Sequence, residues 1–385
     1  MKVSILLPTR NRLELLRLAI ESVRMQDYAD WEILISDNAS DEDIGEHVRK
    51  LADPRIKTRR FDELVPVTEN WNAALECATG DYIIMLGDDD VLVPGGLSRI
   101  RELTDKWGNP DAIYAQAHQY AYANVVPGHA APFVQTGYNA FLAGSQHPFR
   151  LEPRIAHKMA KAAMDFRILY GFNMQHFVFS RALVTRLNVK GPFFQSPYPD
   201  YYAANAVFLA ADSVIVTPEP VALIGISAKS FGFYYVNENE IEGVAFLHNL
   251  EAPEIAPALQ KELVPGSNMN DSWLCAMETL RRNFPEAEGK VSYSRYRRLQ
   301  YHVLLHKPGR GTHLTLLRHM RLWEICLYGL IAGIYFAARI LPQRYANPLR
   351  EAISHALFSR SPRFDPKRRA VPYRNILEAA QAHAG

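Results

Sequence analysis

Residues 82–94 read Tyr-Ile-Ile-Met-Leu-Gly-Asp-Asp-Asp-Val-Leu-Val-Pro. An apolar run that leads through one glycine into the acidic triplet Asp88-Asp89-Asp90 is typical of a buried strand followed by a polar loop. Three adjacent carboxylates repel one another unless solvent or a cation lies among them. Mg²⁺ is usually held by one or two carboxylates together with substrate phosphates, so the triplet predicts a divalent-cation site for a nucleotide diphosphate. The alternative is a solvated turn at the start of the helix that Pro94 opens.

Strand-like and helix-like stretches alternate around this run. Their periodicity predicts strands at 3–8, 31–36 and 56–61, and helices at 13–23, 44–51, 70–78 and after Pro94. This alternation predicts an α/β fold in which helices cover both faces of a mostly parallel sheet. Ligands of such sheets bind at the carboxyl ends of the strands. Three of those ends carry polar clusters, namely Thr9-Arg10-Asn11, Asp37-Asn38 and the acidic triplet.

The middle of the chain is less regular. Residues 123–157 are rich in Pro and Gly and predict a long loop with at most a short helix near 138–142. We expect a returning strand at 175–180, a helix at 201–210 and one or two strands within 214–224. From about Asn237 onward the pattern is mostly helical.

Four motifs in the first hundred residues resemble family 2 glycosyltransferases of the GT-A fold. They are Val3 to Arg12 (VSILLPTRNR), Gln26 to Asp41 (QDYADWEILISDNASD), Gly80-Asp81-Tyr82-Ile83, and the acidic triplet. The resemblance implies a GT-A nucleotide-diphospho-sugar transferase fold and an inverting sugar transfer, with a UDP-sugar as the usual donor and Mn²⁺ or Mg²⁺ as the cofactor. Neither G-x-x-x-x-G-K-[ST] nor G-x-G-x-x-G occurs in the sequence, so no P-loop or dinucleotide fingerprint offers another nucleotide site.

The resemblance also implies where the donor would bind. Pro8, Thr9 and Arg10 would lie along the nucleoside, and Asn72 near the diphosphate. Asp37 would hydrogen-bond the base, which agrees with the ability of a carboxylate to accept from the uracil N3–H. The alternative for Asp37 is a cap of the following helix.

The three carboxylates of the triplet divide these tasks by the same resemblance. Asp89 is the first choice for the metal and Asp88 for the ribose side, while Asp90 either binds metal or supports Asp89. Gly87 stands where family members often carry the first Asp of a D-x-D-D motif, so the division of roles stays open.

An inverting transfer also needs a base for the acceptor hydroxyl. Family members carry an acidic residue at a helix start about a hundred residues after the triplet, and Asp200 in Tyr198-Pro199-Asp200 fits that place. The alternative for Asp200 is an N-cap. His176 and Lys229 are further candidates, facing the acceptor and the diphosphate, with a buried structural histidine and a solvated lysine as their alternatives.

The charge of the chain is divided unevenly. The whole chain has a formal net charge of +2, which argues against a protein that coats nucleic acid with its surface. Residues 295–385 alone carry 16 Lys and Arg against four acids, and they include the apolar stretch 322–341. Its uncharged part, 325–338, is shorter than the roughly 20 residues of a spanning helix. Basic flanks therefore favour a helix lying in an anionic membrane face, with a core helix as the alternative.

These patterns predict three regions: a GT-A catalytic domain (1–225), a helical extension (226–310) and a basic, apolar membrane-associating region (311–385). A membrane-bound enzyme of this class implies a polyprenyl-diphosphate-linked saccharide as the acceptor. Cys77, Cys275 and Cys326 form no C-x-x-C pair, and the N-terminus resembles a strand rather than a signal peptide. We expect an enzyme peripherally bound to the cytoplasmic face of the membrane, either monomeric or oligomeric.

Two other functions remain open. A sugar-1-phosphate nucleotidyltransferase has a related architecture, but its Gly-rich, basic phosphate loop near the N-terminus does not occur in this sequence. A non-catalytic scaffold with a degenerate transferase domain is the second, and the intact carboxylates argue against it.

Overall fold

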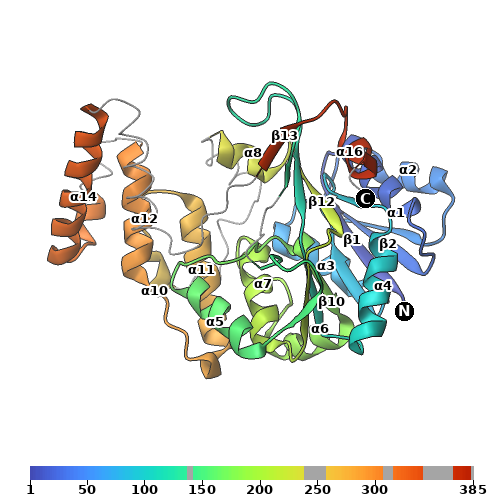
Figure 1. Cartoon of the computed structure of the whole chain (residues 1–385), viewed down its shortest axis with the longest axis horizontal. Coiled ribbons are helices and arrows are strands. Elements are labelled where there is room, and N and C mark those ends of the chain that lie inside the picture. The colour runs from blue at the N-terminus through green and yellow to red at the C-terminus, as the bar shows by residue number, and fades with distance from the viewer. Residues whose placement is uncertain (137–141, 238–256, 307–314, 341–366, 383–385) are drawn as a thin grey trace.

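An eight-stranded mixed sheet forms the centre of the molecule (Figure 1). The computed structural model describes residues 1–136, 142–237, 257–306, 315–340 and 367–382. Strands β1, β2, β3 and β4 are parallel to one another, whereas β10 runs antiparallel to both β4 and β6. The strand order is β3 (Ile56–Arg60), β2 (Trp31–Asp37), β1 (Val3–Thr9), β4 (Tyr82–Met85), β10 (Phe177–Ser180), β6 (Ala112–Ala115), β11 (Val214–Thr217) and β9 (Phe149–Leu151). The predicted α/β architecture is confirmed.

Strands β1 and β2 are buried at every position, which explains why both read as continuous apolar runs. Alternate side chains of β1 enter two different hydrophobic clusters: Ile5 and Leu7 pack on one face of the sheet and Leu6 on the other. The parallel register pairs Thr9 with Asp37. The polar ends of these two strands therefore lie side by side at the carboxyl edge of the sheet.

Helices cover both faces. The cluster around Ile5 includes α1 (Leu13–Arg24), α2 (Ile44–Leu51) and α4 (Gly96–Trp107). The cluster around Leu6 includes α3 (Val67–Glu76), α5 (Pro153–Met164), α6 (Arg181–Leu187) and α7 (Pro199–Ala210). Pro94 precedes α4 instead of lying in its first turn, because Gly95 with φ +72° is the residue that caps this helix.

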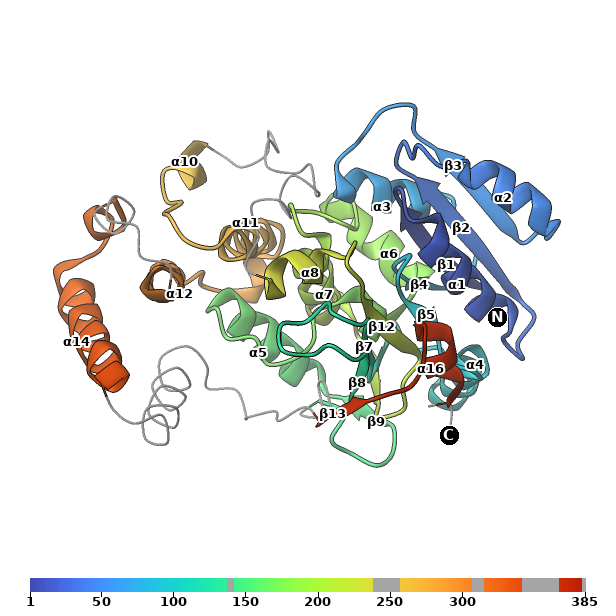
Figure 2. The same ribbon diagram turned by 90° about the horizontal axis from the view of Figure 1, so that it is seen from above.

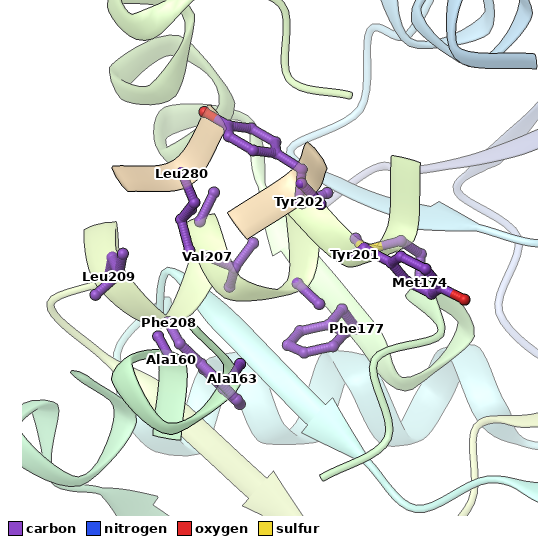
Figure 3. Packing of buried hydrophobic residues seen from close by; sticks show 14 of the residues in the cluster. Ala160, Ala163, Met174, Phe177, Tyr201, Tyr202, Val207, Phe208, Leu209 and Leu280 are labelled. Carbon is purple, nitrogen blue, oxygen red and sulfur yellow. The ribbon is translucent and has the colours of Figure 1, made fainter. Parts of the chain in front are cut away.

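Helix α7 is buried along almost its whole length, and its sequence is apolar all round, as expected of a helix enclosed on every side. Figure 3 shows Val207 and Phe208 of α7 among side chains of its neighbours. Ala160 and Ala163 come from α5, Phe177 from β10, and Leu280 from α11 (Asn268–Asn283). This packing fixes the start of α7, where Asp200 lies.

A second, five-stranded sheet lies beside the first. Its order is β13 (Lys367–Ala370), β8 (Phe133–Thr136), β7 (His118–Ala121), β12 (Ala222–Ile226) and β5 (Val91–Leu92). The long loop predicted for 123–157 is wrong in part, because this segment supplies β8 and β9 and the start of α5. Both strands are short and lie between Pro and Gly residues that mask their pattern. The helix expected near 138–142 falls mostly on residues 137–141, outside the described part of the chain.

The C-terminal half is mostly helical, as expected, and its outer elements lie away from the sheets (Figure 1). Helix α14 lies beside α12, held by a buried ion pair in which Arg297 Nη2 is 2.9 Å from Glu324 Oε1. Within the described ranges, none of the helices combines the length and apolar character needed to cross a membrane. The remaining elements are α8 (Phe231–Val236), α10 (Pro257–Gln260), α12 (Tyr293–His306), α14 (Leu322–Ile340), α16 (Ile376–Ala382) and the 3₁₀ turns η1 (Met174–His176), η2 (Asn188–Lys190) and η3 (Pro285–Ala287).

The last described segment departs from the predicted division of the chain. Residues 311–385 were expected to form one region, whereas β13 and α16 pack on the catalytic domain, where α16 contacts α1 and β5 (Figure 2). The Lys367–Ala370 strand carries no apolar periodicity, so its pairing with β8 could not be read from local sequence.

Candidate active site

The loops after β1 and β2 are bonded to each other at the carboxyl edge of the sheet. The Asn38 N–H donates to the Thr9 carbonyl (2.9 Å), and the Asn11 N–H donates to Ser40 Oγ (2.9 Å). Asn11 adopts a left-handed conformation with φ +52°, and its side chain exchanges two hydrogen bonds with Asp41. The polar clusters predicted at the ends of these strands therefore form one rigid rim.

Asp88 is the anchored member of the acidic triplet. Thr9 Oγ1 donates to Asp88 Oδ2 (2.8 Å), and Arg12 Nη1 forms an ion pair with Asp88 Oδ1 (2.7 Å). The other end of the Arg12 guanidinium donates to the carbonyl of Lys229. Both oxygens of Asp88 are therefore compensated, and Arg12 links Asp88 to the loop that follows β12.

Asp89 is the poorly compensated member. Its side chain is 8% exposed, and Ser227 Oγ lies 3.4 Å from Asp89 Oδ2, a long hydrogen bond. Burial raises the pKa of Asp89 to about 6, against the lowering effect of Arg12, and the neighbouring Asp88 raises it further. A buried carboxylate with so few donors is suited to a cation.

Both carboxylate oxygens of Asp90 accept hydrogen bonds from backbone N–H groups. The Gly225 N–H donates to Asp90 Oδ1 (2.8 Å) and the Gly87 N–H donates to Asp90 Oδ2 (2.9 Å). Burial and the adjacent Asp89 raise the pKa of Asp90. A Cβ at Gly225 would overlap the Asp89 carbonyl oxygen, so this close approach requires glycine. The arrangement fits the expectation that Asp90 supports Asp89 better than direct metal ligation.

The triplet fits a divalent ion that a substrate completes. The described residues hold no group of three or more His, Cys, Asp or Glu side chains arranged to hold a metal on their own. Asp89 offers one carboxylate, which matches the way Mg²⁺ and Mn²⁺ are held by one or two protein oxygens plus substrate phosphates.

Asp37 lies at the end of β2 beside a small cavity. Its side chain is 1% exposed, accepts the Ser40 N–H at 3.0 Å and pairs with Arg60 Nη1 at 2.9 Å. Asp37 does not cap the next helix, because Asp43 occupies that position in α2. The cavity has a volume of about 660 Å³, and its lining includes Asp37, Asp41, Arg49, Thr58 and Arg60.

The other residues expected along the donor lie in different surroundings. Pro8 is within β1, paired with Ser36, and Arg10 has a buried Nε with no hydrogen-bond partner among the described residues. The Asn72 side chain bonds the backbone of Phe194 on both sides, at 2.8 and 3.1 Å. Asn72 thus connects α3 to the loop that leads to Asp200 and lines a cavity of about 1530 Å³ along α3.

Asp200 lies in the first turn of α7. The N-cap of that helix is Tyr198, so Asp200 is not the capping residue. Asp200 Oδ1 accepts the Met174 N–H (2.9 Å), which begins the 3₁₀ turn η1. Because that turn contacts β4 and β12, Asp200 belongs to the same edge of the sheet as the triplet. Burial raises its pKa to about 7.

The two further candidates, His176 and Lys229, lie in different surroundings. His176 is fully buried, its Nδ1 lies 2.9 Å from the Ala115 carbonyl, and its ring stacks on Tyr114. Burial lowers the pKa of His176 to about 4, and the placement fits the structural alternative. Lys229 is exposed, and its Nζ donates to the Asn11 carbonyl (2.9 Å) in the loop after β1.

The structure adds four residues that sequence reasoning did not select: Arg12, Arg60, Gly225 and Ser227. Arg12 closes the Thr9-to-Arg12 motif, so its position in that motif was the available signal. Arg60, Gly225 and Ser227 are far in sequence from the residues they contact, so no local sequence pattern indicated them.

Comparisons with known proteins match the N-terminal part of the chain. Residues 4–169 match the family model described as Glycosyl transferase family 2. Over 106 residues the chain is 37% identical to the GalNAc(5)-diNAcBac-PP-undecaprenol beta-1,3-glucosyltransferase of Campylobacter jejuni, covering 26% of this chain and 34% of that protein. Over 95 residues it is 33% identical to the UDP-Glc:alpha-D-GlcNAc-diphosphoundecaprenol beta-1,3-glucosyltransferase WfgD of Escherichia coli, covering 25% and 38%.

A solved structure is similar over a longer stretch. Residues 1–349 of S. aureus TarS align with 93% of this chain and 89% of that one, at 14% identity and a TM-score of 0.48. The α/β sheet and the acidic loop are consistent with the GT-A fold that the family match implies. The segment that is similar to the family 2 glycosyltransferases, residues 4–169, makes up less than half of the chain. The chain spans about a third of the length of the curated relatives it matches.

Proposed function

We propose that this chain is a metal-dependent, inverting glycosyltransferase that takes its sugar from a UDP-sugar. The observation that carries the proposal is the contrast between Asp88, whose two oxygens are bonded, and Asp89, which has one long hydrogen bond. A divalent cation at Asp89 would be completed by the donor's diphosphate. When bound, Mg²⁺ or Mn²⁺ supplies Lewis-acid stabilisation of the charge on the departing diphosphate.

The donor's base would enter the cavity beside Asp37. A carboxylate there can accept from the uracil N3–H in a charge-assisted bond. Arg60 already pairs with one oxygen of Asp37 and is half exposed, so it can turn toward solvent when the base arrives. The printed name of the E. coli relative includes UDP-Glc, which supports a uridine donor for this chain.

Asp200 would act as the base. The acceptor hydroxyl oxygen forms a bond to the anomeric carbon from the face opposite the diphosphate, and the hydroxyl proton passes to Asp200. The bond between the anomeric carbon and the diphosphate oxygen breaks, and its electron pair leaves with UDP. A carboxylate with a pKa of about 7 holds a proton better than a solvated aspartate, which makes it the stronger base near neutral pH.

We further propose that the acceptor is a polyprenyl-diphosphate-linked saccharide, in the synthesis of a cell-surface polysaccharide or glycan. The names of two relatives contain an undecaprenol-linked acceptor, which supports this class. Helix α14 exposes Leu322 (83%), Trp323 (53%) and Leu330 (63%), preceded by the exposed Arg318 and Arg321. Apolar side chains flanked by arginines suit an anionic lipid surface, where such acceptors lie.

Calorimetric titration of UDP in the presence and absence of Mn²⁺ tests the donor site. We expect UDP to bind more tightly with Mn²⁺, and we expect UDP to be released from a UDP-sugar when acceptor is added. A nucleotidyltransferase would instead release pyrophosphate from UTP and a sugar-1-phosphate. Binding of UDP without any metal effect would contradict the metal-dependent part of the proposal.

Vesicle flotation tests the membrane part. We expect the wild type to float with anionic vesicles, and Leu330→Asp to remove most of that binding because it places a charge in the apolar face of α14. Val189→Asp is the matched control, since Val189 is an exposed apolar residue (84%) outside α14. Equal flotation of both variants and the wild type would place membrane binding elsewhere.

A further inference from the structure

The C-terminal segment returns to the catalytic domain beside the acidic loop. Strand β13 adds to the edge of the second sheet by pairing antiparallel to β8, with Arg369 opposite Val134. Helix α16 follows and packs against α1, β5 and β12 (Figures 1 and 2). Strand β5 starts directly after Asp90, so this segment reaches the back of the triplet from the far end of the chain.

The C-terminal segment contacts Gly225, which in turn contacts the carboxylates of the triplet. The Tyr120 hydroxyl donates to the Tyr373 carbonyl (2.9 Å). The Ile376 side chain is 1% exposed, and its Cδ1 lies 3.2 Å from the position that a Cβ at Gly225 would occupy. Gly225 is the residue whose N–H holds Asp90 and whose backbone touches the Asp89 carbonyl. Ile376 Cδ1 and the Asp89 carbonyl therefore both lie beside the Cα of Gly225, where a side chain would project.

The floor of the acidic loop is an apolar cluster that the C-terminal segment helps to build. Val91 and Val93, which follow Asp90, are both buried in it. The other buried members are Tyr120, Val134, Leu223, Val371, Ile376, Ala379 and Ala380. Four of these come from the C-terminal segment, so without them the floor of the loop would lose much of its packing.

We infer that residues 371–380 position the metal site, with Ile376 holding Gly225 so that Asp90 and Asp89 keep their geometry. The inference rests on the proposed function, because it assigns the segment to the site at which the cation would bind. Three adjacent carboxylates repel one another, and their backbone stays in place only where packing and N–H donors oppose that repulsion. Ile376 is a positioning residue, which acts through Gly225 without touching substrate.

The test uses the full-length protein with Ile376→Ala and with Val371→Ala as its matched control. Both residues belong to the same segment and cluster, but only Ile376 lies against Gly225. In the metal-free protein, we expect Ile376→Ala to speed hydrogen exchange at the Gly225 amide about tenfold or more, and Val371→Ala to change it less than twofold. In Mn²⁺ titrations with UDP, we expect Ile376→Ala to weaken Mn²⁺ about tenfold and Val371→Ala less than twofold.

The outcomes separate the inference from the proposed function. A wild type that binds no Mn²⁺ would overturn the proposed function and this inference with it. Normal Mn²⁺ affinity in a folded Ile376→Ala, or equal weakening in both variants, would overturn the inference alone. If Ile376→Ala does not fold, Ile376→Val removes only the methyl group that contacts Gly225, and we then expect about a threefold loss of Mn²⁺ affinity; an unchanged affinity would overturn the inference.

Discussion

Buried carboxylates at the two ends of the central sheet differ in how many hydrogen-bond and charge partners they have. At the amino end, Glu32 is 1% exposed and receives Lys2 Nζ at 2.8 Å and Lys57 Nζ at 2.9 Å, with further donors from Ser4 and Thr79. At the carboxyl end, Asp89 is almost as buried, and its side-chain donor among the described residues, Ser227, is distant at 3.4 Å. The pKa of Glu32 is lowered because its hydrogen bonds outweigh burial, whereas burial raises the pKa of Asp89.

The difference separates stability from function within one sheet. Glu32 ties β1, β2, β3 and the chain before β4 together, so its charge contributes to folding. Asp89 keeps its charge buried at a cost in free energy, which a ligand can recover on binding. We therefore expect substitution of Asp89 to lower activity without lowering stability, and substitution of Glu32 to do the reverse.

The largest effect is expected at Asp200. Asp200→Asn keeps the shape of the side chain and its acceptor for the Met174 N–H, but it cannot take a proton. We expect kcat to fall by roughly 10²–10⁴-fold, the usual contribution of a general base, with UDP affinity unchanged. Steady-state kinetics and UDP titration check this, and near-normal turnover would remove Asp200 from the role of base.

The pH profile gives Asp200 a second test. Its carboxyl has a pKa of about 7 and must be ionised to accept a proton, so kcat should fall about tenfold per pH unit below 7. Stability should change in the opposite sense, because a raised carboxyl pKa means that the folded state binds the proton more tightly than the unfolded state between about pH 4 and 7. The free energy of unfolding therefore falls as pH rises across that window, and Asp200→Asn should flatten this fall.

The next largest effect is expected at Asp89. Asp89→Asn removes the negative charge proposed to hold the cation, and loss of several kcal/mol of transition-state stabilisation corresponds to roughly 10²–10³-fold in rate. We expect Mn²⁺ binding to be lost and the melting temperature to stay equal or rise, because a buried, poorly compensated charge has been neutralised. A clear fall in melting temperature would mean that Asp89 is a structural residue like Glu32, and the contrast between the two ends would not hold.

Sequence reasoning located the catalytic half of the fold well for a physical reason. Strands β1, β2 and β4 end within one residue of their predicted ends, because strands buried on both faces read as unbroken apolar runs. Strands β6 and β7 are short, and β13 reads Lys-Arg-Arg-Ala, so no periodicity marked any of them. These strands form through partners distant in sequence, which a single chain does not reveal.

The same distinction applies to the candidate site. Asp37, Asp88, Asp89 and Asp200 stood out because each follows a strand end or starts a helix, where polar residues interrupt an apolar pattern. Arg12 and Gly225 act through contacts made only after folding, with Asp88 and Asp90. Sequence patterns identified the carboxylates, and the structure was needed to find the groups that balance or position them.

The smallest effect on activity, and the main effect on stability, is expected at Glu32. Glu32→Gln removes the charge that two lysines share, and we expect the protein to lose about 2 kcal/mol at pH 7, since both lysines are partly exposed and regain water. Transfer activity should stay within about threefold of wild type.

The pKa of Glu32 is lowered in the folded state, so its contribution to the free energy of unfolding is present above the unfolded pKa of about 4.3 and fades as pH falls below it. Urea unfolding at pH 7 and pH 3 should therefore show a large difference between wild type and variant at pH 7 and a smaller one at pH 3; a difference that does not shrink would show that packing, rather than the charge, makes Glu32 stabilising.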